Sequence, residues 1–560
     1  MKKTIMALLS LSLALTMFAG CDDKKPAEST PAATTTAGAD TTTKADVTEG
    51  QETGDVKAEY DGIGNLRITD DPMTVTLFSA FGELGAPTGD MPIWQEGLKI
   101  TGVGIENVAN PSIADRLESL NVMLTSGTLP DVIFGMKGDI APIIQQGGFI
   151  PLDDLIAEHA PNIQAYFDFL PEARVGSTAA DGSVYFIEGT LSSTVGARET
   201  SLIPTMTFFI RQDWLTILDR KVPTTFEEFK ETLYAFRNDD PNGNGQKDEI
   251  PFFFRDGSPV GLYQLFGVNG DWANWGIDTA SKSVVYGRTT ENYKNALREL
   301  AQWYKDGIID PEILTRGSQA RQELLANDIG GMTFDWYEST SNMNYNEEIL
   351  AVVPGLEFLP MLPPADTNGV VKNTYSGAPT SGYAWGISKD CKDPVSVIKF
   401  MDFWFTETGA MLMSYGIEGQ TYNMVDGKPV HTEVATSYSS GIPGYMRTIG
   451  AGGSVSGILE ADISTKTEVA QMTYRMYAES GILMAPFPTL TFTEEEEEVM
   501  NTYNGGIDTL WGQYEQQVLY GQKNVDDSWE GYLAEMKQLG LDEVIAAYNS
   551  AYARYLAEFG

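Results

Sequence analysis

The sequence predicts an α/β fold with two lobes, and three observations lead to this expectation. Short apolar runs typical of strands alternate with amphipathic stretches typical of helices, a pattern that indicates βαβ units and a mostly parallel sheet. The runs lie at residues 73–78, 105–108 and 129–134, and the amphipathic stretches lie at 94–100, 112–126 and 140–146. The chain of 560 residues is long enough to bury more than one core. It has only two cysteines, so we expect core packing, and not a disulfide framework, to stabilise it.

The first 20 residues have the pattern of a secretory signal peptide. Two lysines precede an apolar run at residues 5–18 that is too short for a transmembrane helix, and Cys21 directly follows an Ala-Gly pair. This ending resembles the lipobox of bacterial lipoproteins, in which the cysteine becomes the lipidated first residue. We therefore expect a lipid on Cys21 that attaches the protein to the outer face of the cell membrane. The alternative is an ordinary signal peptide with a cysteine placed there by chance.

Residues 21–65 are predicted to form a disordered tether. They are rich in Thr, Ala, Asp, Lys and Glu and contain almost no large apolar side chain. Such a segment cannot bury enough apolar surface to offset the entropy that ordering would cost. The tether would give the folded lobes reach from the membrane.

The segment DDPNGNGQKDEIP at residues 239–251 is a candidate cation site. The candidate ligands are the side chains of Asp240, Asn242, Asn244, Asp248 and Glu249 and the backbone carbonyl of Gln246. Calcium prefers such oxygen ligands, whereas the absence of sulfur and imidazole makes zinc and copper poor candidates. The first five positions are similar to an EF-hand loop, but Pro251 stands where the closing glutamate would be. We therefore expect Asp248 and Glu249 to close the site, and the alternative is a solvated turn that binds nothing.

A predicted helix leads into this loop. A Thr-x-x-Glu capping box at residues 225–228 is followed by aromatic and apolar residues at helical spacing up to Phe236. The expected ligands leave no obvious open position for a substrate. We therefore interpret the calcium as a structural ion.

Several segments after the tether carry a family resemblance. They are LPDV at 129–132, GFIPLDDL at 148–155, DGSVY at 181–185, IRQDWL at 210–215, YGRTTENYK at 286–294, WYKDGIIDPE at 303–312 and YGIEGQTY at 415–422. Together they resemble family 1 extracellular solute-binding proteins of carbohydrate ABC transporters, specifically the large lipoprotein branch of Gram-positive bacteria. The resemblance covers nearly all of the chain after the tether.

The resemblance implies a two-lobe fold of the periplasmic-binding-protein type II class, with a ligand cleft between two α/β lobes. The first lobe is expected from residues 66–195 and 355–425, and the second from residues 196–354 and 426–560. The implied ligand is an oligosaccharide, and the implied partners are the permease subunits of an ABC transporter. In relatives that bind acidic oligosaccharides, a calcium loop with matching ligands occurs. We expect the protein itself to be a monomer.

Aromatic side chains among Gly, Asp and Asn suit carbohydrate binding, because their flat faces pack against the apolar faces of sugar rings. The expected ligand-binding residues are Trp272, Trp275, Asp335, Trp336, Tyr337, Glu338, Trp385, Gln420 and Tyr422. Asp335 and Trp336 follow an apolar run at 330–334 that is typical of a strand opening into a loop. At each tryptophan the alternative is a buried ring that anchors a loop. Trp404 lies at helical spacing among apolar residues, and we assign it to the core.

The charge of the chain excludes one class of partner. There are 37 Lys and Arg residues against 78 Asp and Glu residues, which gives a formal net charge of −41. Nucleic acid is excluded, because binding to its phosphates depends on positive side chains. The same charge favours a neutral oligosaccharide over a polyanionic one, although a local cluster of Arg or Lys in the cleft would override it.

Two other functions are alternatives to sugar capture. A lipid-anchored glycoside hydrolase needs only a pair of carboxylates, which are abundant here. However, the chain has no G-x-S-x-G, no H-E-x-x-H and no phosphate loop, and its histidines are His159 and His431. We therefore expect no catalytic residues. The second alternative is a binder of another solute such as a peptide, because a fold does not dictate its ligand.

Overall fold

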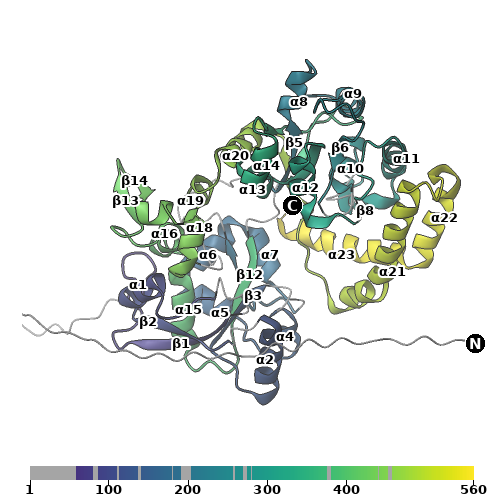
Figure 1. Ribbon diagram of the computed structural model, residues 1–560. Helices are drawn as coiled ribbons and strands as arrows, with labels where there is room; N and C mark the ends of the chain where they lie inside the picture. Colours follow the sequence, from purple (N-terminus) through teal and green to yellow (C-terminus); the bar gives the residue numbers. More distant parts are fainter. Residues whose placement is uncertain are drawn as a thin grey trace, which may run out of the picture. The chain divides into compact units, whose positions relative to one another are not determined.

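The computed structural model describes most of the chain from residue 59 onwards (Figure 1). The described residues are 59–79, 86–109, 113–136, 140–179, 181–190, 204–255, 259–268, 274–278, 280–313, 315–374, 380–438, 441–451 and 457–559. The chain divides into residues Met1–Lys57 and a compact unit, Ala58–Gly560. The expected signal peptide, Cys21 and most of the expected tether lie outside the described residues.

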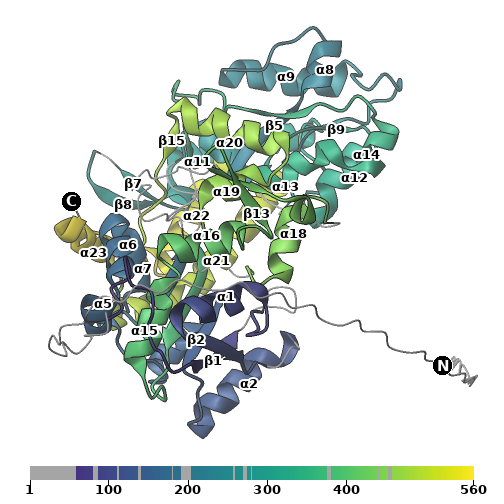
Figure 2. The ribbon, with the colours of Figure 1, turned by 90° about the vertical axis from the view of Figure 1, so that its left-hand side faces the viewer.

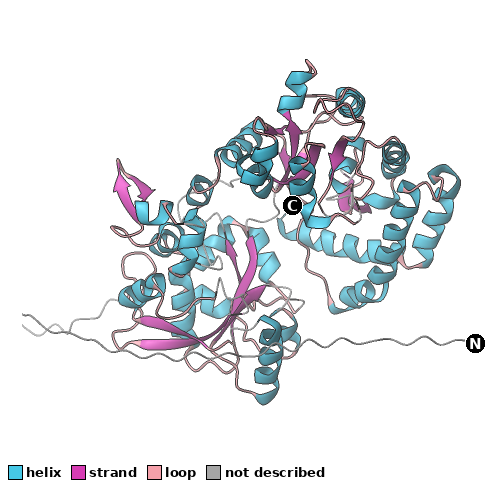
Figure 3. Ribbon diagram, viewed as in Figure 1, coloured by secondary structure: helices cyan, strands magenta, loops and turns pink. Residues whose placement is uncertain are grey.

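The first lobe is built on a sheet of five strands in the order β2-β1-β3-β12-β4 (Figures 1 and 3). The strands are β1 (Met73–Ser79), β2 (Val103–Asn107), β3 (Val132–Met136), β4 (Ile187–Thr190) and β12 (Thr380–Ile387). β1 pairs in parallel with β2 and β3, as the alternation of strands and helices predicts. β12 comes from a distant part of the chain and pairs antiparallel with both β3 and β4.

Helices cover both faces of this sheet, because side chains alternate along a strand and each face carries apolar residues. Val132 and Phe134 of β3 belong to one core, and Ile133 between them belongs to another. The first core takes α1 (Pro92–Thr101), α5 (Asp153–His159), α6 (Pro161–Phe169), α7 (Pro171–Ser177), α15 (Pro394–Phe403), α16 (Glu407–Tyr415) and α18 (Gly441–Thr448), and the second takes α2 (Ile113–Ser126) and α4 (Pro142–Gln145). Trp404 is fully buried, 4.6 Å from Trp94 between ring centroids, which confirms its assignment to the core.

The second lobe is built on a sheet of four strands in the order β10-β5-β9-β6. The strands are β5 (Met206–Arg211), β6 (Ile250–Phe253), β9 (Gly330–Trp336) and β10 (Phe358–Met361). β5 pairs antiparallel with β9 and β10, and β6 pairs in parallel with β9. The expectation of a mostly parallel sheet is therefore wrong for both lobes: two of the three strand pairs of this sheet are antiparallel, and so are two of the four pairs of the first sheet.

Both faces of the second sheet are also covered. Phe208 and Phe252 point into one core, and their neighbours Phe209 and Phe253 point into the other. The first of these cores takes α8 (Gln212–Ile217), α9 (Phe226–Asn238), α10 (Val260–Tyr263) and α11 (Glu291–Lys305), and the second takes α12 (Ala320–Ala326), α13 (Tyr337–Ser341), α14 (Glu347–Val352) and α20 (Glu468–Ser480). α12 and α14 lie side by side in both views (Figures 1 and 2).

Three helices at the end of the chain complete the second lobe. They are α21 (Glu494–Leu519), α22 (Val525–Gln538) and α23 (Leu541–Phe559). α21 begins with the capping box of Thr493 and Glu496, and Gly540, with a φ of 89°, separates α22 from α23. Tyr514, Trp529 and other apolar residues of these helices join the core that contains Phe208.

The packing corrects the boundaries expected for the lobes and for the tether. β10, expected in the first lobe, pairs with β5 of the second, whereas α18, expected in the second lobe, packs into the core of the first through Met446. Tyr60, expected in the tether, is buried, and its hydroxyl donates to Asp402 (2.8 Å). Apolar periodicity marks which residues are buried but not which sheet covers them, so these segments were misplaced.

Short elements complete the described chain. They are β7 (Trp275–Asp278), β8 (Ser283–Tyr286), β11 (Asn373–Thr374), β13 (Tyr422–Val425), β14 (Lys428–His431), β15 (Leu483–Met484), α17 (Glu433–Thr436) and α19 (Leu459–Ser464), together with single turns of 3-10 helix. No helix among the described residues is both long and apolar enough to cross a membrane.

Candidate functional site

Helix α9 leads into the predicted metal loop and also fixes its far end. The hydroxyl of Thr225 accepts the N–H of Glu228, and the Glu228 carboxylate accepts the N–H of Thr225, so the predicted capping box is present. In the last turn, Arg237 Nη1 donates to the carbonyl oxygens of Lys247 (3.2 Å) and Glu249 (2.6 Å). The start and the end of the loop are therefore both held by one helix.

The backbone of the loop turns tightly around the Asp240 carboxylate. Asp240, Gly243 and Gly245 have positive φ values of 48°, 69° and 74°. Glycine adopts this region without strain, and aspartate tolerates it better than most residues. The Asp240 carboxylate accepts the N–H groups of Asn244 (3.1 Å) and Gly245 (3.0 Å). The turns thus place main-chain groups of the loop around this side chain.

The structure brings four predicted ligand side chains into one hydrogen-bonded loop. Asn242 Oδ1 accepts the N–H of Asn244 (3.1 Å), and Asn244 Oδ1 accepts the N–H of Gln246 (2.7 Å). Asn244 Nδ2 lies 3.2 Å from each carboxylate oxygen of Asp248. Asp240, Asn242, Asn244 and Asp248 are therefore connected to one another through the loop itself.

Glu249, the last predicted ligand, has an unusual environment. It is fully buried, and neither of its carboxylate oxygens has a hydrogen-bond partner. Burial, together with nearby Asp248 and Asp240, raises the pKa of the Glu249 carboxyl. No group of three or more His, Cys, Asp and Glu side chains in the described part of the chain is arranged to hold a metal ion. A cation in this loop would therefore depend on the amide and backbone carbonyl oxygens of the predicted set.

A second cluster lies at the carboxyl ends of β6 and β9, which are parallel neighbours. Asp335 is buried, and its Oδ1 accepts the N–H of Trp336 (2.7 Å). Arg255, two residues after β6, brings Nε to 3.6 Å from the same oxygen, and Arg321 Nη1 lies 3.3 Å from Oδ2. In open α/β sheets, ligands bind outside the carboxyl ends of the strands. This cluster is therefore the candidate solute site of the second lobe.

Trp336 presents an aromatic surface at this cluster. Its side chain is 41% exposed, although tryptophan is usually well buried. Its backbone is held on one side by the Asp335 carboxylate and on the other by the ladder of β9, in which Trp336 pairs with Met206. The ring is therefore attached to a fixed strand end and remains accessible to a ligand.

Three other aromatic residues of the expected ligand set are core residues. Tyr337, Trp385 and Tyr422 are only 7%, 3% and 7% exposed. Trp385 packs against Phe134 at 5.8 Å between ring centroids, and Tyr422 packs against Tyr415 at 5.7 Å. Because protein atoms cover these rings, the structure does not support them as stacking residues for a sugar.

The remaining expected residues are dispersed. Trp275, in β7, stacks on Tyr548 of α23 at 3.8 Å between ring centroids. Glu338 is paired with Lys466 (2.6 Å), and Gln420 is exposed in a turn. Trp272 lies outside the described residues. Asp335, Trp336 and Glu338 thus follow one another at the end of β9, and no hydrogen bond, ion pair or ring contact between described residues joins Trp275 or Gln420 to them.

Sequence reasoning missed Arg255 and Arg321. Neither lies in a recognisable motif, and each reaches Asp335 from a different element. The one available signal was the position of Arg255 after a buried apolar run. That signal has no meaning until β6 is known to be the parallel neighbour of β9.

Residues 94–411 make up more than half of the chain. They match the family described as bacterial extracellular solute-binding protein. The chain belongs to this family. The resemblance and the two-lobe α/β fold expected from the sequence are confirmed. The family is one of binding proteins, so this solute-binding protein is not an enzyme.

Three relatives of this solute-binding protein are informative. The fructooligosaccharide ABC transporter substrate-binding protein FusA of Streptococcus pneumoniae is 25% identical, and the match covers 82% of this chain and 86% of the relative. The polygalacturonan/rhamnogalacturonan-binding protein YtcQ of Bacillus subtilis is 22% identical, with 56% and 60% covered. Among solved structures, alginate-binding protein AlgQ2 without calcium ion is 29% identical with a TM-score of 0.67, covering 87% of this chain and 99% of that chain.

The end of this solute-binding protein matches a second family. Residues 488–557 match a domain of unknown function. The match includes all of α21 and α22 and most of α23, whose apolar residues lie in the same core as β5, β6 and β9. In this protein the matched segment is therefore an integral part of the second lobe.

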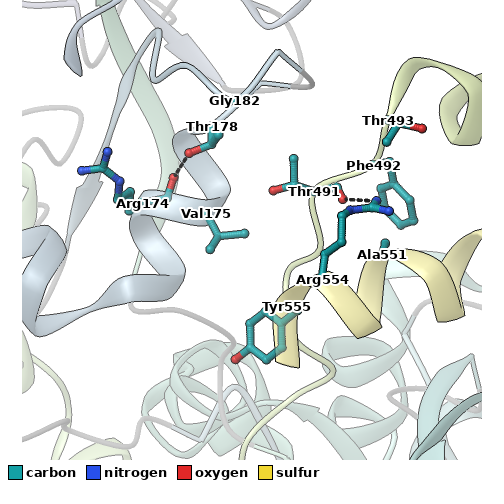
Figure 4. Close-up of a pocket in the computed structure, with 10 residues that line it drawn as sticks. All are labelled: Arg174, Val175, Thr178, Gly182, Thr491, Phe492, Thr493, Ala551, Arg554 and Tyr555. Carbon is teal, nitrogen blue, oxygen red and sulfur yellow. Dashed lines mark hydrogen bonds between the residues drawn. The ribbon is translucent and has the colours of Figure 1, made fainter. Parts of the chain in front are cut away.

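A pocket of about 390 Å³ is lined by α7, by the segment before α21 and by α23 (Figure 4). The lining residues are Arg174, Val175, Thr178, Gly182, Thr491, Phe492, Thr493, Ala551, Arg554 and Tyr555. Both arginines are engaged: Arg174 Nη2 lies 3.2 Å from Asp153, and Arg554 pairs with Glu496 and donates to the carbonyl of Thr491 (3.0 Å). None of the expected ligand residues lines this pocket, so it does not bear on the choice of solute site.

Proposed function

We propose that this protein binds an oligosaccharide outside the cell and delivers it to the permease subunits of an ABC importer. The observation that carries the proposal is the exposed indole of Trp336 at the end of β9, beside Asp335 and Arg255. A flat ring packs on the apolar face of a sugar, and adjacent charged groups hydrogen-bond to its hydroxyls. The relatives support this reading, because FusA is named for a fructooligosaccharide and AlgQ2 for alginate.

The proposed ligand is a neutral oligosaccharide. The net charge of −41 disfavours the approach of a polyanion. At the candidate site the guanidinium groups of Arg255 and Arg321 face the Asp335 carboxylate, and Lys466 faces Glu338. The positive charges near Trp336 thus have carboxylates of the protein itself as neighbours, which favours uncharged hydroxyl groups over a uronate.

The proposal includes the place of the protein in the cell. A lipid on Cys21 would hold the protein, as a monomer, at the outer face of the membrane, where its transporter lies. Cell fractionation checks this part: Cys21→Ser should move the protein from the membrane fraction into the medium. Retention of that variant on washed membranes would contradict the anchor.

Trp336→Ala should weaken oligosaccharide binding about 5- to 150-fold, which corresponds to the loss of about 1–3 kcal/mol of ring stacking. Isothermal titration calorimetry against kestose, an alginate trisaccharide and a galacturonan trisaccharide measures this and separates neutral from acidic ligands. Trp336→Phe is the matched control, because it keeps an aromatic face on the same strand end and should lose less.

Two results would count against the sugar site. Unchanged affinity in Trp336→Ala would remove Trp336 from the site, and tight binding of the acidic sugars alone would replace the neutral ligand with a uronate. The sugar recovered after long incubation should have an unchanged mass, as a binding protein requires.

We also propose that the loop at residues 239–251 binds calcium as a structural ion. Two observations support such an ion: Glu249 is a buried carboxylate whose oxygens have no hydrogen-bond partner, and Asp240, Asn242, Asn244 and Asp248 are joined by hydrogen bonds within the same loop. A buried charge is costly unless it is paired, and a calcium ion would supply the missing positive charge. The AlgQ2 structure, described as one without calcium ion, supports the choice of metal.

Removal of calcium should lower the melting temperature. An ion that binds only the folded state stabilises it by about 2.7 kcal/mol when its free concentration is about 100 times its Kd. Asp240→Asn should remove most of this sensitivity, since asparagine tolerates the positive φ but lacks the charge. Differential scanning calorimetry with calcium or EDTA is the measurement, and exposed Asp239→Asn is the control. A wild-type melting curve that is the same in EDTA would refute the site.

A further inference from the structure

Asp328 connects the metal loop to the core of the second lobe. It lies just before β9, and its backbone has a φ of 57°, in the left-handed region. Its carbonyl oxygen accepts a hydrogen bond from Asn242 Nδ2 (3.0 Å), and its carboxylate lies 2.7 Å from Arg211 Nη2. One residue thus contacts the loop through its main chain and the core through its side chain.

The Arg211 side chain, which Asp328 contacts, is itself held in place by other residues of the core. Its side chain is 1% exposed at the end of β5, and its guanidinium lies over the ring of Trp214, 4.4 Å from the centroid. Asp213 holds the same guanidinium, with Nε 2.9 Å from Oδ1 and Nη2 2.6 Å from Oδ2. Because Arg211 is held from two sides before it meets Asp328, the position of Asp328 is set by the core and not by the loop.

The contact decides which end of the Asn242 amide faces the loop. Nδ2 donates to Asp328, so Oδ1 points inward, where it accepts the N–H of Asn244 (3.1 Å). Oδ1 is the atom that can bind a cation, whereas an inverted amide would turn its N–H groups toward the positive charge. The orientation of this ligand therefore depends on a carbonyl that belongs to another part of the chain.

We infer that Arg211 and Asp328 are positioning residues for the metal loop, acting through the Asn242 amide. The inference rests on the proposed calcium site. The ion pair holds Asp328 in its left-handed conformation, the conformation aims its carbonyl at Asn242, and the hydrogen bond fixes the ligand atom. Residues that orient metal ligands in this way typically change metal affinity about 10- to 100-fold when they are replaced.

Asp328→Asn tests the inference in the full-length protein. Asparagine accepts the left-handed backbone as readily as aspartate, so the variant loses the charge of the ion pair without new strain. Calcium titration by calorimetry should show an affinity about 10-fold or more below that of the wild type. Glu515→Gln is the control, because it removes the charge of another buried carboxylate of the same lobe, which lies 3.6 Å from Arg288, and its partners Tyr263, Tyr293 and Arg288 lie outside the loop. It should lower the melting temperature in EDTA while leaving the calcium affinity close to that of the wild type.

The outcomes separate this inference from the metal site on which it rests. If the wild type binds calcium and Asp328→Asn binds it equally well, the positioning role is overturned and the metal site stands. If both variants lose affinity in proportion to their loss of melting temperature, general destabilisation explains the result and the positioning role is again overturned. A wild type that takes up no calcium overturns the metal site together with the role of Arg211 and Asp328.

Discussion

Glu515→Ala is expected to lower the free energy of unfolding by about 3–5 kcal/mol, because it removes one partner of a buried charged cluster. Glu515 lies in α21 and is 5% exposed. Its Oε2 accepts the hydroxyl protons of Tyr263 (2.5 Å) and Tyr293 (2.8 Å) and lies 3.6 Å from Arg288 Nη1. Without the carboxylate, two buried hydroxyls lose their acceptor and the buried guanidinium loses its nearest negative charge.

Urea denaturation followed by circular dichroism measures this loss. Glu498→Ala is the control, since Glu498 lies on the same helix but is exposed, and its replacement should change stability by less than about 0.5 kcal/mol. Glu515→Gln should fall between the two, because it keeps an acceptor for the tyrosines and lacks the charge. Equal stability of Glu515→Ala and Glu498→Ala would show that α21 does not depend on this cluster.

Asp402→Ala is expected to cost about 3 kcal/mol of stability, since it leaves several buried donors without an acceptor at about 1–3 kcal/mol each before water enters the space. Asp402 is fully buried in α15. One carboxylate oxygen accepts the N–H groups of Asn162 and Ile163, each at 2.8 Å, at the start of α6. The other accepts the Tyr60 hydroxyl and Asn162 Nδ2, also at 2.8 Å each.

The pH dependence of stability identifies this carboxyl directly. Burial raises the pKa of Asp402 from 3.8 to about 6 in the folded protein. Between these values the folded state binds the proton more tightly than the unfolded state does. The contribution of Asp402 to the free energy of unfolding therefore falls as the pH rises from about 4 to about 6, by about 3 kcal/mol in total, and is constant above.

Asp402→Asn lacks this titration and isolates it from the other carboxyls. The measurement is the difference in free energy of unfolding between wild type and Asp402→Asn at each pH, from urea denaturation. The difference should fall between pH 4 and 6 and level off above. A difference that stays flat over this range, or rises, would contradict the raised pKa.

The hydrogen-bonded clusters around Glu515 and Asp402 show what local sequence patterns miss. The apolar spacing around Trp404 predicts a buried helix, and the structure confirms that Trp404 is buried. The same pattern gives no reason to choose Asp402, two positions earlier, as the residue that holds Tyr60 across 342 positions of sequence. In α21, likewise, nothing in the sequence separates buried Glu515 from the exposed glutamates at the start of the helix.

The proposed solute site shows the same limit of local sequence patterns. Asp335 and Trp336 were expected from a strand that opens into a loop, and the structure places them at the end of β9. Trp385 and Tyr422 were also expected to bind the ligand, and they are core residues. An aromatic residue in a polar segment has the same local signature whether its ring faces a ligand or the core, so only packing separates Trp336 from the other two.

The sequence by itself determined the features that depend on neighbours a few positions away: the capping box at Thr225, the strands around β1 and β3, and the oxygen-rich loop after α9. These follow from hydrogen bonds and periodicity within one or two turns of chain, which residue order specifies directly. Tertiary structure alone decided that Glu249 is buried without a partner and that Arg255 meets Asp335. Those contacts join separate strands and helices, and their free energy comes from burial that exists only once the sheets have formed.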